Sequence, residues 1–228
     1  MKQSDSNPVK RVFLVDDHPL VRERLAQLID QQPDLQVCGE ASDVPEALDA
    51  LERTMPDVAV VDLSLKNSSG LELIKDIKAR GWDIPVLVLS MHEEMLYAER
   101  VLRAGGLGYL SKQESSREIL LGIRKVIQGQ VHVSGEVAGL MLRRIASGSG
   151  KSKEATVESL ADRELQVFQL IGHGNSTRKI AETLNLSVKT VESYRARIKE
   201  KLLLDDGVQL LQRAVHWVES GAGREGGA

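Results

Sequence analysis

Five polar side chains follow the apolar runs in the first half of the chain, each close to the point where a run ends. They are Asp16 and Asp17 after VFLV, Asp62 after DVAVV, Ser90 after PVLVL and Lys112 just beyond GLGYL. Gathered in one place, three carboxylates could bind Mg²⁺, and a hydroxyl and an ammonium group could hold the oxygens of a transferring phosphoryl group. Asp62 could also act as a nucleophile and become an aspartyl phosphate.

Each of these residues also has an ordinary explanation. Aspartate is common in turns, where Asp62 would simply cap the next segment, and a single lysine is usually solvated. Their joint position favours chemistry, because ligands in open α/β sheets bind beyond the carboxyl ends of the strands. The sequence therefore predicts a phosphoacceptor site with Mg²⁺ as its cofactor.

The elements that would position these side chains alternate along the first half of the chain. Short apolar runs are separated by longer segments of helical spacing, such as PLVRERLAQLID and GLELIKDIKAR. Such alternation predicts five βα units, forming a doubly wound five-stranded parallel sheet over residues 10–130 with helices on both faces.

Length and composition indicate a soluble protein of two domains. The chain has 228 residues, of which 42% are hydrophobic and 28% charged, and its net charge is −3. No apolar run reaches the roughly 20 residues that span a bilayer, and the first ten residues lack the apolar core of a signal peptide. We therefore expect a cytoplasmic protein without a membrane partner. The single cysteine, Cys38, excludes an internal disulfide and is interpreted as a buried thiol.

The pattern changes after residue 130. Residues 131–154 are predicted to be a linker, because IASGSGKSKEATVES is rich in Ser, Gly and Lys. Residues 155–220 contain four short helical segments and no strand signal, and the glycine-rich residues 221–228 are predicted to be a disordered tail. Gly172, Gly174 and Asn185 are candidate helix ends, and Ser187 is a candidate N-cap.

The second and third of these segments are separated by a very short connection, which predicts a helix-turn-helix. The third, SVKTVESYRARIKEKL, carries five basic residues against two acidic ones. Val188, Val191, Ile198 and Leu202 follow a spacing that can face the core. A charged helix face is often only solvated, but the net positive charge after a tight turn favours double-stranded DNA as the partner. The candidate DNA contacts are Arg178, Lys179, Lys189, Thr190, Glu192, Ser193, Arg195, Arg197 and Lys199.

The first half resembles the receiver domain of bacterial two-component response regulators. LVDDHPLVRERL and VLVLSMHEEMLYAERVLRAGGLGYLSK are similar to the NarL/FixJ subfamily. The resemblance implies a flavodoxin-like receiver, Mg²⁺ on Asp16, Asp17 and Asp62, and phosphoryl transfer to Asp62 from a sensor histidine kinase. It places Ser90 and Lys112 on the phosphoryl oxygens.

The resemblance also suggests a switch and shows two departures from the family pattern. Tyr109 would be the aromatic residue that moves inward when Ser90 is drawn to the phosphate, although an edge aromatic can also simply pack. Many receivers have a proline in the loop after the acceptor aspartate and another after the lysine, where this chain has LKNSSG and Gln113. A cis bond after Lys112 is therefore disfavoured by about 2.5–4 kcal/mol.

The second half resembles the LuxR-type DNA-binding domain over about residues 155–220. Ala161 stands where members often have Thr or Ser, so the usual cap is missing and Asp162 is a candidate substitute. The last helix of this family commonly supplies dimer contacts, for which Leu210, Leu211, Ala214 and Val218 are candidates. The whole chain is thus predicted to be a transcriptional response regulator that forms a homodimer when phosphorylated.

Two alternatives use the same residues. A phosphatase of the haloacid dehalogenase type would need a second aspartate two residues after the nucleophile, where this chain has Ser64. A phosphorylation-independent DNA binder with a vestigial receiver is less favoured, because the full set of acidic, hydroxyl and lysine residues is present.

Overall fold

The computed structural model describes residues 8–65, 68–91, 94–146, 157–184 and 186–222. The chain divides into two compact units, Met1–Gly150 and Lys151–Ala228. This division falls inside the range 131–154 that the sequence predicts as a linker. Within the described residues, no helix is long and apolar enough to cross a membrane.

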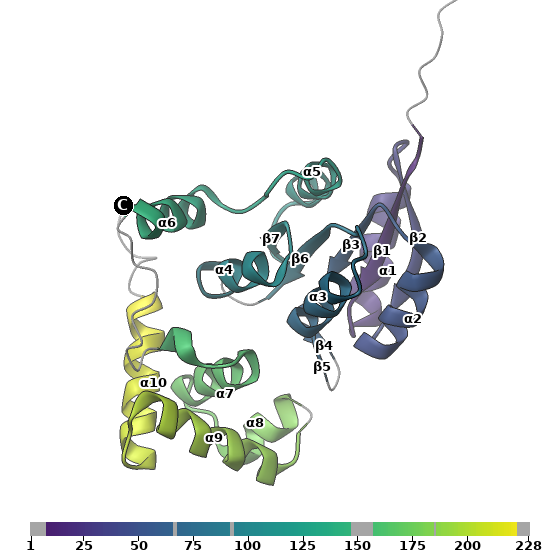
Figure 1. Cartoon of the computed structure of the whole chain (residues 1–228). Helices are drawn as coiled ribbons and strands as arrows, with labels where there is room; N and C mark the ends of the chain where they lie inside the picture. Colours follow the sequence, from purple (N-terminus) through teal and green to yellow (C-terminus); the bar gives the residue numbers. More distant parts are fainter. Residues whose placement is uncertain (1–7, 66–67, 92–93, 147–156, 185, 223–228) are drawn as a thin grey trace, which may run out of the picture. The chain divides into compact units, whose positions relative to one another are not determined.

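The first unit is built on a five-stranded parallel sheet with strand order β2-β1-β3-β6-β7 (Figure 1). The strands are β1 (Lys10–Val15), β2 (Leu35–Ala41), β3 (Val58–Val61), β6 (Val86–Ser90) and β7 (Gly108–Ser111). All four neighbouring pairs are parallel, so the doubly wound sheet predicted from the sequence is confirmed. Beyond β3, the short strands β4 (Ser64–Leu65) and β5 (Ser68–Ser69) form an antiparallel pair.

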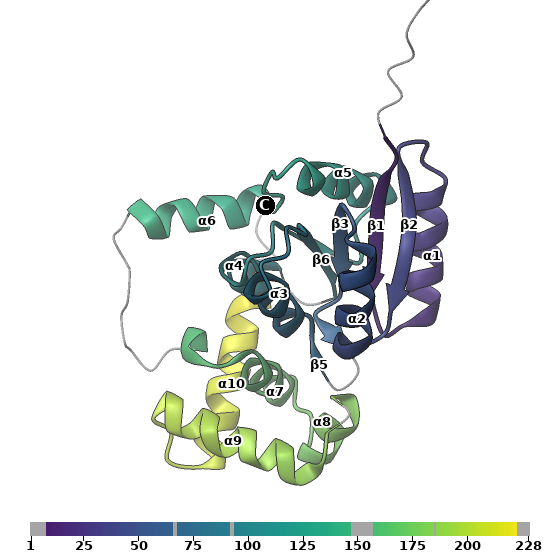
Figure 2. The ribbon, with the colours of Figure 1, turned by 45° about the vertical axis from the view of Figure 1, so that its right-hand side comes forward.

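Five helices cover the two faces of this sheet (Figure 2). On one face lie α1 (Pro19–Asp30) and α5 (Ser116–Ile127), and on the other α2 (Val44–Thr54), α3 (Gly70–Ala79) and α4 (Glu94–Ala104). Caps define several helix starts: Asp43, Ser69 and Ser115 each accept a backbone N–H of the first turn. Ile29 and Ile123, both fully buried, join the strand residues in the core between the sheet and the first pair of helices.

A sixth helix, α6 (Gly135–Ala146), lies within the range predicted as linker. His132 forms a bridge beside Gly108 of the edge strand, and the Ser134 backbone N–H donates to Glu94 Oε1 of α4 at 2.6 Å. Ser134 also accepts from the Val137 N–H and thereby caps the helix. Because Val137 is buried, residues 132–137 are part of the packed first unit, and the linker prediction was wrong for them.

The second unit is entirely helical and begins with the 3₁₀ turn η1 (Val157–Ser159). Its helices are α7 (Asp162–Gly172), α8 (Thr177–Thr183), α9 (Val188–Leu202) and α10 (Gly207–Ala222). Phe168 of α7 is fully buried, and its ring centroid lies 5.6 Å from that of Trp217 in α10. The four predicted helices are present. The last continues to residue 222, into the first two positions of the predicted tail, and residues 223–228 lie outside the described residues.

The predicted helix ends of this unit had mixed outcomes. Ser187 caps α9, accepting the Thr190 N–H at 3.0 Å, while Asn185 lies outside the described residues. Ala161 is the N-cap of α7 without a side-chain cap, and its own N–H donates to Glu164 Oε2 at 2.7 Å. Glu164 therefore supplies a hydrogen bond to the N-cap residue.

Gly172 marks a close approach of α7 to α10, and its replacement should destabilise the second unit. A Cβ at Gly172 would lie 2.5 Å from both the Ala214 carbonyl oxygen and Val218 Cγ2. Relieving such overlap costs typically about 1–3 kcal/mol. Gly172→Ala should lower the free energy of unfolding in chemical denaturation. Gly207→Ala is the control, since its nearest neighbour would be 3.7 Å away, and equal stability of the two variants would contradict this packing.

Candidate functional site

The carboxyl ends of the central strands bring the predicted acidic residues together. Asp16 follows β1 and Asp62 follows β3, which are hydrogen-bonded neighbours, so both carboxylates lie at the same sheet edge. Lys112, just after β7, extends its ammonium group to Asp16 Oδ2 at 2.6 Å and Asp62 Oδ2 at 2.7 Å. The two aspartates are 3% and 4% exposed, so these ion pairs are shielded from water.

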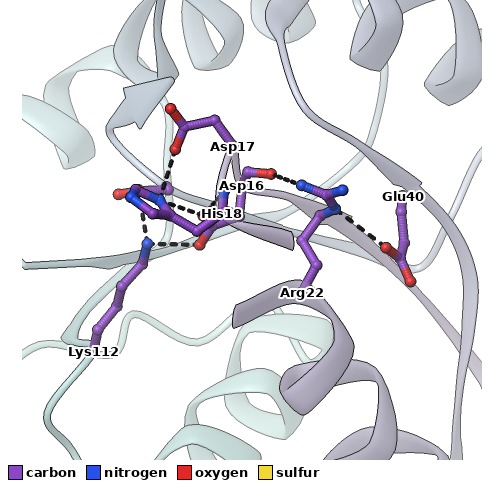
Figure 3. A network of polar contacts seen from close by, with 7 residues as sticks. Asp16, Asp17, His18, Arg22, Glu40 and Lys112 are labelled. Atoms are coloured by element: carbon purple, nitrogen blue, oxygen red, sulfur yellow. Dashed lines mark hydrogen bonds and ion pairs between the residues drawn. The ribbon is translucent and has the colours of Figure 1, made fainter. Parts of the chain in front are cut away.

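Asp17 adds a third carboxylate to Asp16 and Asp62 (Figure 3). The His18 imidazole lies between the first two aspartates, with Nδ1 2.7 Å from Asp17 Oδ1 and 3.2 Å from Asp16 Oδ1. Arg22 of α1 holds the loop from the other side by donating to the Asp16 carbonyl and pairing with Glu40 at 3.2 Å. Arg22 thus connects the loop after β1 with both α1 and β2.

The donor set fits a hard divalent cation. One ligand atom from each of Asp16, Asp17, His18 and Asp62 lies within 4.8 Å of all the others. Among the described residues, Asp62 Oδ1 is buried and has no hydrogen-bond partner. A buried acceptor left unsatisfied is costly, and an ion bound by these oxygens would satisfy it.

The electrostatics of the site depend on burial and on one lysine. Burial raises the pKa of Asp62, and the ammonium group of Lys112 only partly offsets this effect. Burial alone would lower the pKa of Lys112, but the Asp62 and Asp16 carboxylates outweigh it and raise that pKa. Lys112 therefore stays charged and can stabilise negative charge that develops beside Asp62.

Because the pKa of Asp62 is raised in the fold, ionisation of this carboxyl group lowers the free energy of unfolding. A carboxyl group whose pKa is higher in the folded state stabilises the fold when protonated, and this contribution is lost as pH rises from the unfolded value of about 3.9 through the folded value. In the absence of metal, Asp62→Asn should therefore be more stable than wild type at neutral pH, and the difference should shrink toward low pH.

Chemical denaturation of both proteins in EDTA across this pH range measures the effect. Asp49→Asn, a change at an exposed carboxylate, controls for the loss of one negative charge. A less stable Asp62→Asn at neutral pH would mean that the pair with Lys112 outweighs burial.

Ser90 and Tyr109 lie beside this site and are both fully buried. Their side chains are hydrogen-bonded, and burial raises the pKa of the Tyr109 hydroxyl. The ring of Tyr109 is therefore enclosed within the fold. The peptide bond after Lys112 is trans, as are all those in the described chain.

Position 70 must be a glycine because the backbone of Asp62 lies very close to it. A Cβ at Gly70 would lie 2.1 Å from the Asp62 carbonyl oxygen, and the Gly70 N–H donates to the Leu63 carbonyl at 2.9 Å. The start of α3 therefore presses directly against the backbone of the Asp62 loop.

The second unit presents a separate charged surface on α8 and α9. Along α9, Lys189, Glu192, Ser193, Ala196 and Arg197 are all exposed, at spacings that place them on one side of the helix. Val191, Ile198 and Leu202 are buried on the opposite side, as predicted. The exposed side is available to a partner.

The remaining candidates of this surface differ in orientation. Arg178 and Lys179 of α8 are exposed. Thr190 hydroxyl contacts the Ser187 hydroxyl at 2.8 Å within the cap, and Lys199 is half-buried. Arg195 is only 23% exposed and lies 3.7 Å from Glu192.

Val188 contradicts the sequence prediction. It is 48% exposed rather than in the core. Val188 is the first residue of α9, directly after the N-cap Ser187.

Comparison with known proteins identifies both units. Residues 12–124 match the response regulator receiver domain, and residues 158–214 match the LuxR family of bacterial regulatory proteins. The chain is 34% identical to the response regulator UvrY of Escherichia coli K12 over 204 residues, which cover 90% of this chain and 93% of UvrY. The chain is a response regulator of the NarL/FixJ family.

Other relatives agree with this assignment. The response regulator is 36% identical to the transcriptional regulatory protein LiaR of Bacillus subtilis 168, over 87% of its own length and 93% of that of LiaR. Among solved structures it resembles RcsB of Salmonella enterica serovar Typhimurium bound to the rprA promoter with phosphomimetic BeF₃⁻, at 26% identity and a TM-score of 0.58, covering 90% and 97% of the two chains. RcsB has also been solved as two dimers bound to two parallel DNAs.

This response regulator therefore combines a receiver domain with a LuxR-type DNA-binding domain and functions as a transcriptional regulator in a two-component system. It is not a classical enzyme, so the phosphatase alternative is set aside. One residue of the acidic site, His18, received no role from the sequence. Its position directly after two aspartates at a strand end was the available signal.

Proposed function

We propose that Asp62 accepts a phosphoryl group from a sensor histidine kinase, with Mg²⁺ held by Asp16, Asp17 and Asp62. The observation that carries this proposal is the buried contact of Lys112 with both Asp16 and Asp62, at 2.6 and 2.7 Å. A bound Mg²⁺ would neutralise the phosphoryl oxygens during transfer.

The residues of the chain have distinct parts in this reaction. A carboxylate oxygen of Asp62 attacks phosphorus, a new P–O bond forms, and the bond from phosphorus to the kinase histidine nitrogen breaks. Lys112 stabilises the charge on the phosphoryl oxygens, and Ser90 donates its hydroxyl to one of them. Because the Ser90 and Tyr109 side chains are hydrogen-bonded, a shift of Ser90 would break or strain this bond and thereby change the position of the Tyr109 hydroxyl. The same site can take a phosphoryl group from a small donor without the kinase.

The second unit would use this signal to bind DNA as a homodimer. Two copies of α9 would enter the major grooves of paired half-sites, with α10 contributing dimer contacts. Leu211 of α10 is 44% exposed, which suits such a contact, whereas Leu210 and Ala214 are fully buried within the unit. RcsB, solved as two dimers bound to two parallel DNAs, supports binding to DNA as a dimer. Binding to DNA would place the protein in the cytoplasm.

Comparing the full chain with residues 151–228 tests how the signal is transmitted. If the receiver masks the DNA-binding helices, residues 151–228 should bind DNA without phosphorylation and more tightly than the unphosphorylated full chain. Fluorescence anisotropy on one DNA fragment, at matched protein concentrations, measures both affinities.

Size measurements on the full chain with and without acetyl phosphate complete this experiment. If residues 151–228 bind less well than the unphosphorylated full chain, masking is the wrong mechanism. Phosphorylation-driven dimerisation, visible as a doubled mass, then becomes the better explanation.

A further inference from the structure

His18 lies at the acidic site, and its side chain does not cap the helix that follows it. It is the N-cap residue of α1, but its side chain makes no capping hydrogen bond. The imidazole is 63% exposed, yet it is turned onto the carboxylates, with Nδ1 2.7 Å from Asp17 and 3.2 Å from Asp16 (Figure 3). The imidazole thus contacts both carboxylates although most of the side chain is exposed.

The atoms around His18 Nδ1 have the spacing of a metal site. Nδ1 and one carboxylate oxygen each from Asp16, Asp17 and Asp62 are mutually within 4.8 Å, so one ion could contact all four. An independent observation points to a ligand: Asp62 is 4% exposed, and its Oδ1 has no hydrogen-bond partner among the described residues.

We propose that His18 Nδ1 is a nitrogen ligand of the divalent cation bound by these three carboxylates. The inference rests on the proposed function, because it assumes that a cation binds at Asp16, Asp17 and Asp62. A histidine ligand would add a preference for transition metals that carboxylates alone do not give. Imidazole suits Mn²⁺, Ni²⁺ and other first-row transition metals far better than Mg²⁺, which prefers oxygen ligands.

If His18 is not a metal ligand, its removal should have the opposite effect on metal affinity. If the imidazole only forms an ion pair with the two neighbouring carboxylates, it competes with an incoming cation. Its removal would then strengthen metal binding. A ligand, in contrast, contributes to affinity, and most strongly for ions that favour nitrogen.

Electron spin-echo spectroscopy of bound Mn²⁺ tests the coordination directly. The full chain without a polyhistidine tag, carrying one equivalent of Mn²⁺, should show modulation from a coordinated imidazole nitrogen. Labelling with ¹⁵N-histidine should change the modulation frequency. The signal should disappear in His18→Asn and persist in His173→Asn, which alters an exposed histidine of the other unit.

Calorimetric titration provides a second readout that does not depend on phosphorylation. His18→Asn should lose at least about tenfold in Ni²⁺ affinity, the lower end of the loss caused by removing even an outer-shell partner of a metal ligand. Its Mg²⁺ affinity should change much less. Asparagine is a favoured N-cap residue, so α1 should keep its stability in this variant.

These measurements distinguish failure of the role of His18 from failure of the metal site itself. Mn²⁺ that binds in wild type, is lost in Asp17→Asn and shows no nitrogen modulation would overturn the role of His18 and leave the carboxylate site intact. Tighter metal binding by His18→Asn would also overturn it. If wild type binds no Mn²⁺, or if Asp17→Asn binds it equally well, the proposed metal site itself is wrong.

Discussion

Asp62→Asn should abolish phosphorylation of this response regulator. With Mg²⁺ and acetyl phosphate, the wild-type chain should gain one phosphoryl group that hydroxylamine removes, because an acyl phosphate is readily cleaved by this nucleophile. The variant keeps the size and burial of the side chain but lacks the nucleophilic oxygen. Intact-mass measurement should therefore find the added phosphoryl group only in wild type.

Two controls make this result specific to Asp62. Asp49→Asn removes an exposed carboxylate of α2 and should be labelled like wild type. Circular dichroism should show the same helix content in all three proteins. Labelling of Asp62→Asn to the wild-type level would place the acceptor at another residue, and unlabelled wild type would favour the alternative of a vestigial receiver.

The sequence predicts the sheet and the position of Asp62 well because both follow from strong local patterns. Each apolar run of the first unit is short, is followed by a segment of helical period and ends in a polar residue. Parallel strands must present their carboxyl ends at one edge, so the neighbourhood of Asp16 and Asp62 follows once the sheet is assumed. Lys112 follows β7 of the same parallel sheet, so it lies at this edge too and contacts both carboxylates.

Features that depend on tertiary contacts could not be predicted in this way. The sequence predicts residues 132–137 as the start of a linker. Their packing depends on the bridge to Gly108 and the hydrogen bond from Ser134 to Glu94, which join segments far apart in the sequence. Val188 has the spacing of a core residue but is 48% exposed at the first position of α9. His18 follows two aspartates at a strand end, but only the geometry of the loop turns its imidazole onto Asp17.

The charged surface of the second unit leads to a prediction about which side chains read DNA sequence and which hold its backbone. Lys179 is exposed near the start of α8, with its ammonium group 3.9 Å from Glu182 Oε2. Lys179→Ala should weaken binding to specific and non-specific DNA alike. It should also make the dependence of log affinity on log salt shallower by about one unit, since one phosphate contact is lost. Arg213→Ala, which removes an exposed charge from α10, should leave this slope unchanged.

Glu192 should behave differently because an acidic side chain that faces DNA is repelled by phosphates. It lies on the same exposed side of α9 as Lys189 and Arg197. Its cost is offset only if it accepts a hydrogen bond from a cytosine amino group or orients a basic neighbour, and Arg195 is 3.7 Å away. Glu192→Ala should therefore change the preference among sites in a randomised library, by about 1–3 kcal/mol at the base that it contacts. Titrations of the best and worst sites at several salt concentrations measure this change. A uniform rise in affinity for every sequence would show that Glu192 only repels the backbone, and the side of α9 that reads bases would then have to be assigned to other residues.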